Sequence, residues 1–249
     1  MVWKFLDTGS NTGRFNMDLD IQLANNLSEN EVIFRVYSWN PYCISLGANQ
    51  CNEEINIEKA RLDNIDVVKR PTGGRAILHS EELTYSVIYP IDYKTSAHDL
   101  YNQINLALKK GLIFYNYTMN QLELENNQPD LKNFYKQDKS TICFAVSSKS
   151  EINFNSKKLV GSAQRKMGKV ILQHGSILSG NYHLKIVDYL KIDNSVRQII
   201  KGEIVNSTID LKTILKKEID YNRLKNSLKM GFESHFNIQF NLFNETVFT

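Results

Sequence analysis

The chain has 249 residues, of which 42% are hydrophobic and 23% charged, and its formal net charge is +3. These fractions are typical of a globular protein with enough apolar residues for a buried core. The slight, scattered positive charge gives no argument for nucleic-acid binding, although a local basic patch could still steer an acidic partner. No apolar run reaches the roughly 18 residues of a membrane span, and residues 1–10 lack the order of a secretory signal.

The three cysteines, Cys43, Cys51 and Cys143, are an odd number and lack the spacing of a metal site. We therefore expect at least one free thiol, a cytoplasmic location, no metal site and no membrane association. Cys43 lies on an apolar strand, where a lone cysteine is more often a small core residue than a nucleophile.

Apolar periodicity and turn residues predict the elements of the first half of the chain. The expected elements are a strand at 3–7, a turn at 9–13, a helix at 16–27, strands at 32–39 and 44–47, a helix at 55–62, strands at 65–68 and 83–88, and a helix at 96–112 that begins with a capping Ser96.

Residues 117–140 are polar and predict a long connection, either a lid over a binding site or a disordered insertion. The later predicted elements are short strands at 152–154, 159–161 and 170–172, helices at 185–191, 211–218 and 222–236, and a strand at 237–243. With no internal repeat and no Pro-rich or Gly-rich linker, the chain is expected to be a single domain over 1–249 without a separate accessory domain.

The most informative motif is RPTGGRAILH at residues 70–79, between two apolar, β-branched runs. It predicts a strand, a glycine turn and a second strand. Gly73 and Gly74 allow positive φ and let a ligand approach main-chain N–H groups, which are candidate donors to an oxyanion. Arg70, Arg75 and His79 add groups that suit an anionic or polar ligand end.

From spacing alone, a β-hairpin with solvated arginines is an equally good interpretation of this motif. Other ligand-binding turns do not fit, because no Gly-Lys-Ser/Thr follows and the spaced third glycine of a dinucleotide turn is missing. A Ser–His–Asp hydrolase is disfavoured because the chain has no Gly-x-Ser-x-Gly elbow.

The motifs together resemble the superfamily of lipoate–protein ligases, octanoyltransferases and biotin–protein ligases, most closely its LipM-type octanoyltransferases. The resemblance extends from residue 6 to about residue 178, and residues 180–249 form a weakly matched helical part. The matching segments are LDTG at 6–9, NM at 16–17, ISLG at 44–47, RPTGGRA at 70–76, LH at 78–79, KKLVGSAQ at 157–164 and ILQHGSIL at 171–178.

The resemblance implies an α/β fold with a mixed, largely antiparallel sheet flanked by helices, and an apolar tunnel for an acyl chain. It implies an acyltransferase of lipoate biosynthesis that moves octanoyl from acyl carrier protein to a lysine of a lipoyl domain, on glycine-cleavage H protein or a 2-oxoacid dehydrogenase E2. No cofactor is implied beyond the phosphopantetheine that carries the acyl donor.

Aligned on the family, Cys143 falls on the nucleophile that carries the acyl group as a thioester, and Lys158 on the functional lysine. An ammonium beside the thiol would stabilise its thiolate. The implied substrate-binding residues are Arg70, Thr72, Gly73, Gly74, Arg75, His79, Gly161 and Ala163. Without the resemblance, Cys143 reads as a buried core cysteine and Lys158 as a solvated turn lysine. Both His79 and His174 also fit core or turn histidines; His79, in the matched motif, could bind substrate or relay a proton, and His174 is expected to be structural.

Alternatives of the same fold stay open. An ATP-dependent lipoate–protein ligase would use Lys158 and the glycines to hold an acyl-adenylate and would need ATP and Mg²⁺, but Arg75 stands where such ligases carry a third glycine. A transferase between two lipoyl domains would also use the cysteine, and a non-catalytic binding module is disfavoured by the intact motifs. One departure from the LipM pattern is Ala145-Val146-Ser147 where an acidic residue usually follows Cys-Phe.

Overall fold

The computed structural model describes residues 1–91, 95–124 and 151–242 of the protein. Its strands are β1 (Val2–Asn11), β2 (Glu31–Trp39), β3 (Cys43–Leu46), β4 (Asp66–Lys69), β5 (Ile77–His79), β6 (Glu82–Pro90), β7 (Leu122–Leu124), β8 (Ile152–Phe154), β9 (Lys157–Met167), β10 (Val170–Leu178) and β11 (Asn241–Leu242). Its α-helices are α1 (Gly13–Asn26), α2 (Ile57–Leu62), α3 (Ala97–Tyr115), α5 (Asn194–Ser207), α6 (Leu211–Leu215) and α7 (Tyr221–Phe236). Its 3-10 helices are η1 (Asn52–Glu54), η2 (Tyr117–Gln121) and η4 (Tyr182–Tyr189).

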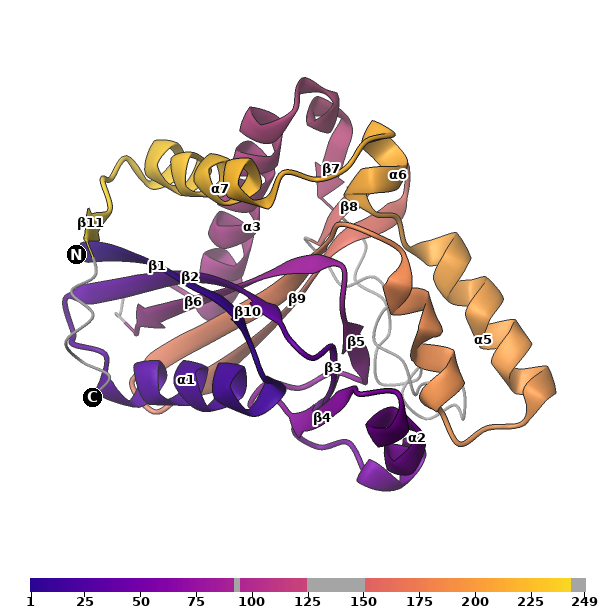
Figure 1. Ribbon diagram of the computed structural model, residues 1–249. Helices are drawn as coiled ribbons and strands as arrows, with labels where there is room; N and C mark the ends of the chain where they lie inside the picture. Colours follow the sequence, from indigo (N-terminus) through magenta and orange to yellow (C-terminus); the bar gives the residue numbers. More distant parts are fainter. Residues whose placement is uncertain (92–94, 125–150, 243–249) are drawn as a thin grey trace.

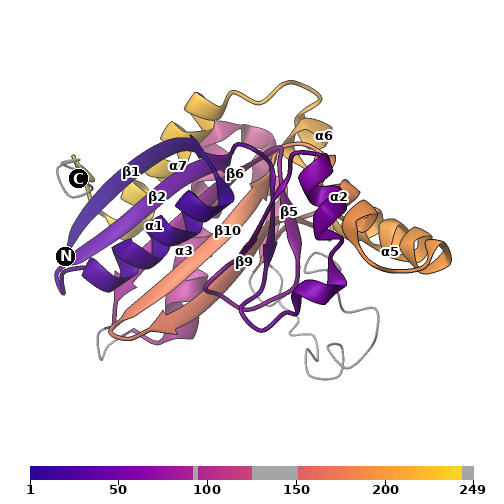
Figure 2. The same cartoon turned by 60° about the horizontal axis from the view of Figure 1, so that its bottom comes forward.

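The described strands form two sheets that lie beside each other (Figures 1 and 2). The larger has eight strands in the order β11-β1-β2-β6-β10-β9-β8-β7, and the smaller has three in the order β4-β3-β5. In the large sheet β11–β1 and β1–β2 are parallel and all the other neighbours are antiparallel. The expected mixed, largely antiparallel sheet flanked by helices is therefore confirmed.

Helices cover both faces of the large sheet. On one face, α3 and α7 pack together and bury apolar side chains, including Leu108, Leu112, Leu228 and Phe232, against the strands. On the other face α1 lies along the sheet, as Figure 2 shows. Burial of an apolar face, at roughly 1.5–3 kcal/mol per large side chain, is what holds these layers together.

The small sheet has an apolar core of its own. Side chains of β3 and β5 pack with residues of η4 and α5, which lie beyond this sheet in Figure 1. The buried members of this core are Ile44, Leu46, Ile55, Ala60, Ile65, Ala76, Leu78, Leu178, Ile186, Val187, Tyr189, Leu190, Ile200 and Ile204. This core holds the small sheet in place beside the large one.

The predicted helix starts agree with the structure where a capping residue is present. Ser96 caps α3 by accepting a hydrogen bond from the Asp99 N–H at 3.0 Å. For α1, the cap is Thr12, which accepts from Phe15 N–H, so the helix begins three residues before the predicted position. The turn predicted at 9–13 is therefore wrong, because β1 continues to Asn11 through a register shift around Gly9, whose φ is +67°.

The hairpin interpretation of residues 70–79 is also wrong. β4 and β5 flank the glycine turn, yet they do not pair with each other, because β3 lies between them. β3 pairs with β4 in parallel and with β5 in antiparallel orientation. The glycine turn therefore crosses over the end of β3 instead of closing a hairpin.

Three further predictions differ from the structure. The segment predicted as a connection from 117 begins with η2 and β7, and its residues 125–140 lie outside the described part of the chain. The short strands expected at 159–161 and 170–172 are parts of the longer β9 and β10. The helix α5 was not predicted, because only Ile200 and Ile204 of its residues are buried and its apolar face is narrow.

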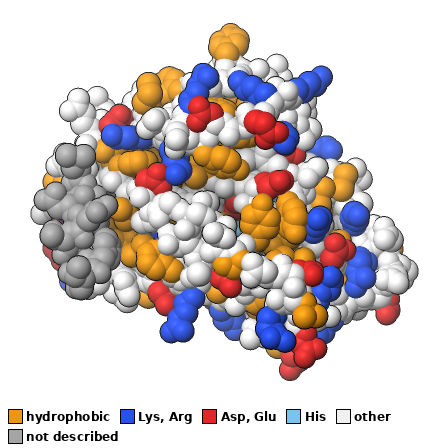
Figure 3. Space-filling model, viewed as in Figure 1, with side chains coloured by type: hydrophobic (Ala, Val, Ile, Leu, Met, Phe, Trp, Pro, Cys, Tyr) orange, Lys and Arg blue, Asp and Glu red, His pale blue; other side chains and the backbone are white. Residues whose placement is uncertain are grey.

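Among the described helices, none combines the length and the hydropathy needed to cross a bilayer. The face of the molecule drawn in Figure 3 shows hydrophobic side chains in separate groups between charged side chains of both signs. This face therefore offers no single charged field that would by itself select a partner.

Candidate active site

A cavity opens between the large and the small sheet, and Lys158 lies in its wall; we call it the Lys158 cavity. The space between its lining residues, including the opening to solvent, is about 480 Å³. Its lining residues are Met17, Tyr37, Trp39, Ser45, Arg70, Ile77, His79, Thr84, Glu151, Lys158, Gly161, Ser162, Ala163, His174, Gly175 and Ser176. Several charged and polar side chains converge on this space from two sheets, which is the arrangement expected of a site for a small molecule.

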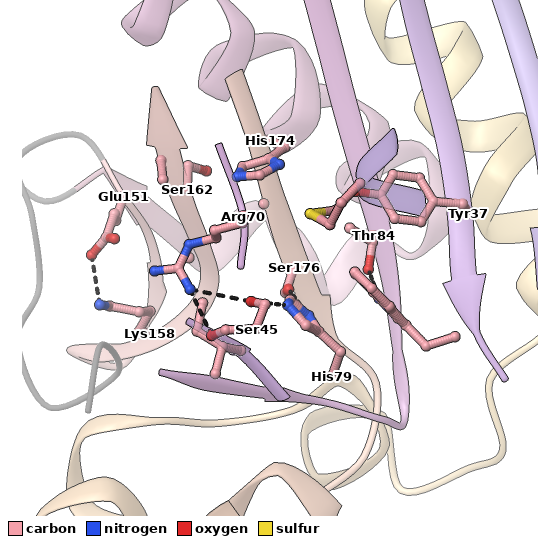
Figure 4. Close-up of a pocket in the computed structure, with 16 residues that line it drawn as sticks. Tyr37, Ser45, Arg70, His79, Thr84, Glu151, Lys158, Ser162, His174 and Ser176 are labelled. Atoms are coloured by element: carbon pink, nitrogen blue, oxygen red, sulfur yellow. Dashed lines mark hydrogen bonds and ion pairs between the residues drawn. The ribbon is translucent and has the colours of Figure 1, made fainter. Parts of the chain in front are cut away.

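Lys158 is buried in β9, with a side chain only 2% exposed, and its Nζ lies 3.0 Å from Oε2 of Glu151. Glu151 is also buried and lines the same cavity (Figure 4). The interpretation of Lys158 as a solvated turn lysine is therefore wrong. A buried ammonium is costly without a carboxylate partner, so the Glu151 carboxylate compensates the charge of Lys158 inside the protein.

Arg70 lies in the cavity wall and also fastens the glycine turn, residues 71–75. Its guanidinium donates to the carbonyl oxygens of Gly73 at 2.9 Å and Arg75 at 2.7 Å. It also donates to the carbonyl of Ser45 at 2.8 Å and to Ser45 Oγ at 3.1 Å. One side chain therefore links β3, the turn and the cavity.

The turn lies so close to the end of β3 that one position there requires glycine. A Cβ at Gly47 would lie 1.9 Å from the carbonyl oxygen of Gly74, and Gly74 itself has a φ of +96°. Thr72, Gly73, Gly74 and Arg75 are not among the lining residues of the Lys158 cavity. Arg75 instead pairs with Glu54 at 3.5 Å, and Gly74 and Arg75 line a separate shallow hollow.

His79 in the cavity wall has three hydrogen-bonding partners, Glu82, Ser45 and Ser176, the last with its Oγ 3.2 Å from Nδ1. Its Nδ1 lies 2.8 Å from Oε1 of Glu82, and its Nε2 lies 2.7 Å from Oγ of Ser45. Burial alone raises the pKa of Glu82, but the charge of His79 and hydrogen bonds from His79, Thr84 and Ser176 outweigh it, so that the net pKa is lowered. Glu82 is therefore a carboxylate at neutral pH.

His174, expected to be structural, lines the cavity and reaches the glycine turn. Its Nε2 lies 2.6 Å from Oγ1 of Thr72, and its Nδ1 lies 3.6 Å from Oδ2 of Asp20 on α1. Burial lowers the pKa of His174, against the opposing effect of Asp20, so the ring is neutral near pH 7. Asp20 in turn pairs with the fully buried Arg35 at 2.7 Å.

The described residues place the predicted site residues in two groups. Arg70, His79, Lys158, Gly161 and Ala163 lie in the wall of the Lys158 cavity, and Thr72, Gly73, Gly74 and Arg75 lie behind it in the turn. Cys143 is outside the described part of the chain. Cys43 is buried among core residues as predicted, and burial, with the charges of Asp66 and Glu82, raises its pKa well above the ordinary value.

Sequence reasoning missed the acidic partners Glu151, Glu82 and Asp20. A signal existed for Asp20, because it lies between Met17 and Ala24 at the spacing of the buried helix face, where an acidic residue needs a partner. No cluster of three or more metal-ligating side chains occurs in the described ranges.

Solved structures share this fold. Lipoate-protein ligase A bound with ATP superposes with a TM-score of 0.75 at 18% identity, covering 98% of this chain and 90% of that one. A bipartite lipoate protein ligase from Thermoplasma acidophilum gives a TM-score of 0.77 at 18% identity, covering 98% and 88%. The fold is therefore that of the lipoate–protein ligase catalytic domains.

The sequence comparisons are more specific. Residues 12–233 match the family of the lipoyl protein ligase A/B catalytic domain, and the chain belongs to this family. It is 33% identical to octanoyltransferase LipM of Staphylococcus epidermidis over 246 residues, covering 96% of this chain and 88% of the relative. It is also 33% identical to octanoyltransferase LipM of Bacillus subtilis, covering 95% and 87%. The expected resemblance is confirmed, and these relatives make the protein an acyltransferase of the octanoyltransferase type.

Proposed function

We propose that this protein takes an octanoyl group from acyl carrier protein onto Cys143 and delivers it to a lysine of a lipoyl domain in the cytoplasm. The observation that carries the proposal is the buried Lys158–Glu151 pair, which lies in one cavity with Arg70 and His79. The octanoyltransferase relatives, matched along nearly the whole chain, support the same reaction class.

The chemistry requires a thiol and a cation close to each other. Exchange of one thioester for another is nearly thermoneutral and amide formation is downhill, so this route needs no nucleotide. The Lys158 ammonium would stabilise the Cys143 thiolate and polarise the carbonyl of the incoming thioester. Lys158 is therefore proposed as the activator and Cys143 as the nucleophile.

The remaining predicted residues take two roles in this proposal. Arg70, His79, Gly161 and Ala163 would contact the acyl group and its carbonyl end, because they line the cavity. The glycine turn, with Thr72, Gly73, Gly74 and Arg75, would act on the substrate through Arg70, whose guanidinium is held by the carbonyl oxygens of Gly73 and Arg75. The proposed partners are acyl carrier protein as donor and a lipoyl domain as acceptor.

The test is intact-mass spectrometry after incubation with octanoyl-acyl carrier protein. The wild type is expected to gain one octanoyl group, which hydroxylamine removes as it does other thioesters. Cys143→Ala is expected to gain none, and Cys51→Ala, which removes the exposed free thiol, is expected to be labelled like the wild type. Full labelling of Cys143→Ala would contradict the proposal.

A further inference from the structure

We propose that Ser45, His79 and Glu82 form a proton shuttle for the second half of the reaction, in which the acceptor lysine attacks the enzyme-bound thioester. Ser45 and His79 pass the proton, and Glu82 positions His79. This inference rests on the proposed function, since it needs an acyl-enzyme and an amine acceptor.

The three side chains form a continuous chain of hydrogen bonds that ends in the cavity. His79 Nδ1 to Glu82 Oε1 is 2.8 Å, and His79 Nε2 to Ser45 Oγ is 2.7 Å. Ser45 and His79 both line the Lys158 cavity, and Figure 4 shows them between Arg70 and Ser176. The chain thus connects the space for the acyl group with a buried carboxylate.

The partners of His79 fix its tautomer. A carboxylate can only accept, so in the neutral ring Glu82 selects the tautomer with hydrogen on Nδ1, and Nε2 is left to accept the hydrogen of the Ser45 hydroxyl. The imidazolium that forms when Nε2 takes up a proton is the charge that lowers the pKa of Glu82. Glu82 Oε1 also accepts from Thr84 at 2.6 Å and Ser176 at 2.7 Å, which holds it in place.

Two further contacts hold this arrangement ready for proton transfer. The indole of Trp39 stacks on the imidazole of His79 with ring centroids 4.2 Å apart and fixes the plane of the ring. Arg70 donates to Ser45 Oγ at 3.1 Å, so the oxygen is stabilised while its hydrogen moves to His79. This is the geometry of a general base that acts through a hydroxyl.

The two halves of the reaction differ in their need for a base. In the first half a thiolate displaces a thiolate, and no proton has to move. In the second half the amine nitrogen bonds to the acyl carbon, the C–S bond breaks with its electron pair on sulfur, and the nitrogen must lose a proton. The amine proton moves to Ser45 Oγ while the Ser45 proton moves to His79 Nε2, and Cys143 departs as the thiolate that Lys158 stabilises. The proton then leaves His79 for solvent, from which the released thiolate of the acyl carrier protein takes up one proton, so that the cycle balances.

The same residues also join the two sheets, because Ser45 and His79 belong to β3 and β5, and Glu82 belongs to β6. A purely structural role predicts that both half-reactions suffer together when a link is removed. A shuttle predicts that only the second suffers. The first half-reaction therefore serves as the internal measure of whether the site is folded.

The experiment measures the two half-reactions separately for Ser45→Ala. Acylation by octanoyl-acyl carrier protein is expected to stay within about threefold of the wild type. Transfer from the isolated acyl-enzyme to a lipoyl domain is expected to fall by about 10²-fold or more, the usual contribution of general acid–base catalysis. Ser227→Ala, which removes a buried hydroxyl on α7 outside the cavity, is the matched control and leaves both rates unchanged.

Glu82→Gln tests the positioning role, because an amide N–H facing Nδ1 favours the wrong tautomer of His79. We expect the maximal transfer rate to fall while the KM for the lipoyl domain stays the same. Equal transfer rates in Ser45→Ala and the wild type, or a parallel loss of both half-reactions, would overturn the shuttle and leave the proposed function standing. Absence of any wild-type acyl-enzyme would instead overturn the proposed function, and the shuttle with it.

Discussion

At the scale of single residues, the charged side chains in and near the cavity wall are buried as ion pairs. Lys158 Nζ lies 3.0 Å from Glu151 Oε2, and Arg35 Nη1 lies 2.7 Å from Asp20 Oδ1. All four side chains are nearly or fully buried. Breaking such a pair leaves an uncompensated charge, at a cost of about 3–5 kcal/mol. Lys158 and Glu151 line the cavity, and the Arg35–Asp20 pair joins β2 to α1.

Lys158→Met tests the proposed activation of the thiol. Without the ammonium, less of Cys143 is thiolate at neutral pH, so acyl-enzyme formation at pH 7 is expected to be slower by about tenfold or more. The difference from the wild type is expected to shrink as the pH is raised above about 8.5, where an unassisted thiol ionises, and to leave only the loss of carbonyl polarisation. Stopped-flow acylation against pH measures this, and an equal slowing at every pH would contradict the activation.

Asp20→Asn tests the buried ion pair behind His174. Burial raises the pKa of Asp20, but Arg35 and the hydrogen bonds from His174 and Arg35 bring it below the ordinary 3.8. A depressed carboxyl stabilises the fold at neutral pH, and this contribution is lost as the pH falls through the folded-state pKa. We expect Asp20→Asn to lower the free energy of unfolding by about 3–5 kcal/mol at pH 7, and by less near pH 3.

The control for that experiment is Asp18→Asn on the same helix. Asp18 is exposed and pairs with an exposed Arg14, so its loss should change the free energy of unfolding by less than about 0.5 kcal/mol. Urea titrations at several pH values measure both variants. A pH-independent effect of Asp20→Asn would show that the ion pair is not the cause.

At the scale of elements, the helix pair α3 and α7 supports the sheet through backbone contact. A Cβ at Gly231 would lie 2.4–2.7 Å from backbone atoms of Gly111 and Ala107. Large side chains at this crossing would push the helices apart, so their close packing on the sheet depends on the two glycines.

Gly231→Ala is therefore expected to lower the free energy of unfolding by about 1–3 kcal/mol, although alanine favours the helix. Gly202→Ala is the matched variant, since no atom lies within 4 Å of its Cβ position on α5. It should gain up to about 1 kcal/mol. Thermal and urea unfolding give both values, and a stabilised Gly231→Ala would contradict the close crossing.

The sequence allowed prediction of elements whose signal is local. Ser96 marks the start of α3, and the apolar face of α7 shows in Leu224, Leu228 and Phe232, all fully buried. It did not show that β3 inserts between β4 and β5, because strand pairing depends on segments far apart in the chain. The hairpin interpretation failed for this reason.

Only part of the site was predictable from the sequence, for a physical reason. Lys158, Arg70 and His79 stand in motifs with a fixed spacing, and these residues meet in one cavity. Their acidic partners have no motif of their own: Glu82 begins β6, and Glu151 directly precedes β8. Only the folded chain shows that Glu151 pairs with Lys158 and Glu82 with His79.

At the scale of the whole molecule, two sheets of different size lie beside each other, as Figures 1 and 2 show from two sides, and residues of both line the Lys158 cavity. The large sheet supplies Lys158, His174 and Ser176, and the small sheet supplies Ser45 and His79. These side chains of the cavity wall are therefore held by regular strands, which keep their positions better than loops do. A lipoate-protein ligase A bound with ATP shares this fold, whereas the sequence relatives are octanoyltransferases, so the fold alone does not decide the reaction.

The most direct test of this account is a single-turnover experiment with the isolated octanoyl-enzyme and a lipoyl domain, in the absence of ATP. We predict that the octanoyl group leaves the enzyme and appears on one lysine of the domain, at a rate that matches steady-state turnover. An inert octanoyl-enzyme, together with modification of the domain from free octanoate only when Mg·ATP is added, would contradict the account and favour a ligase.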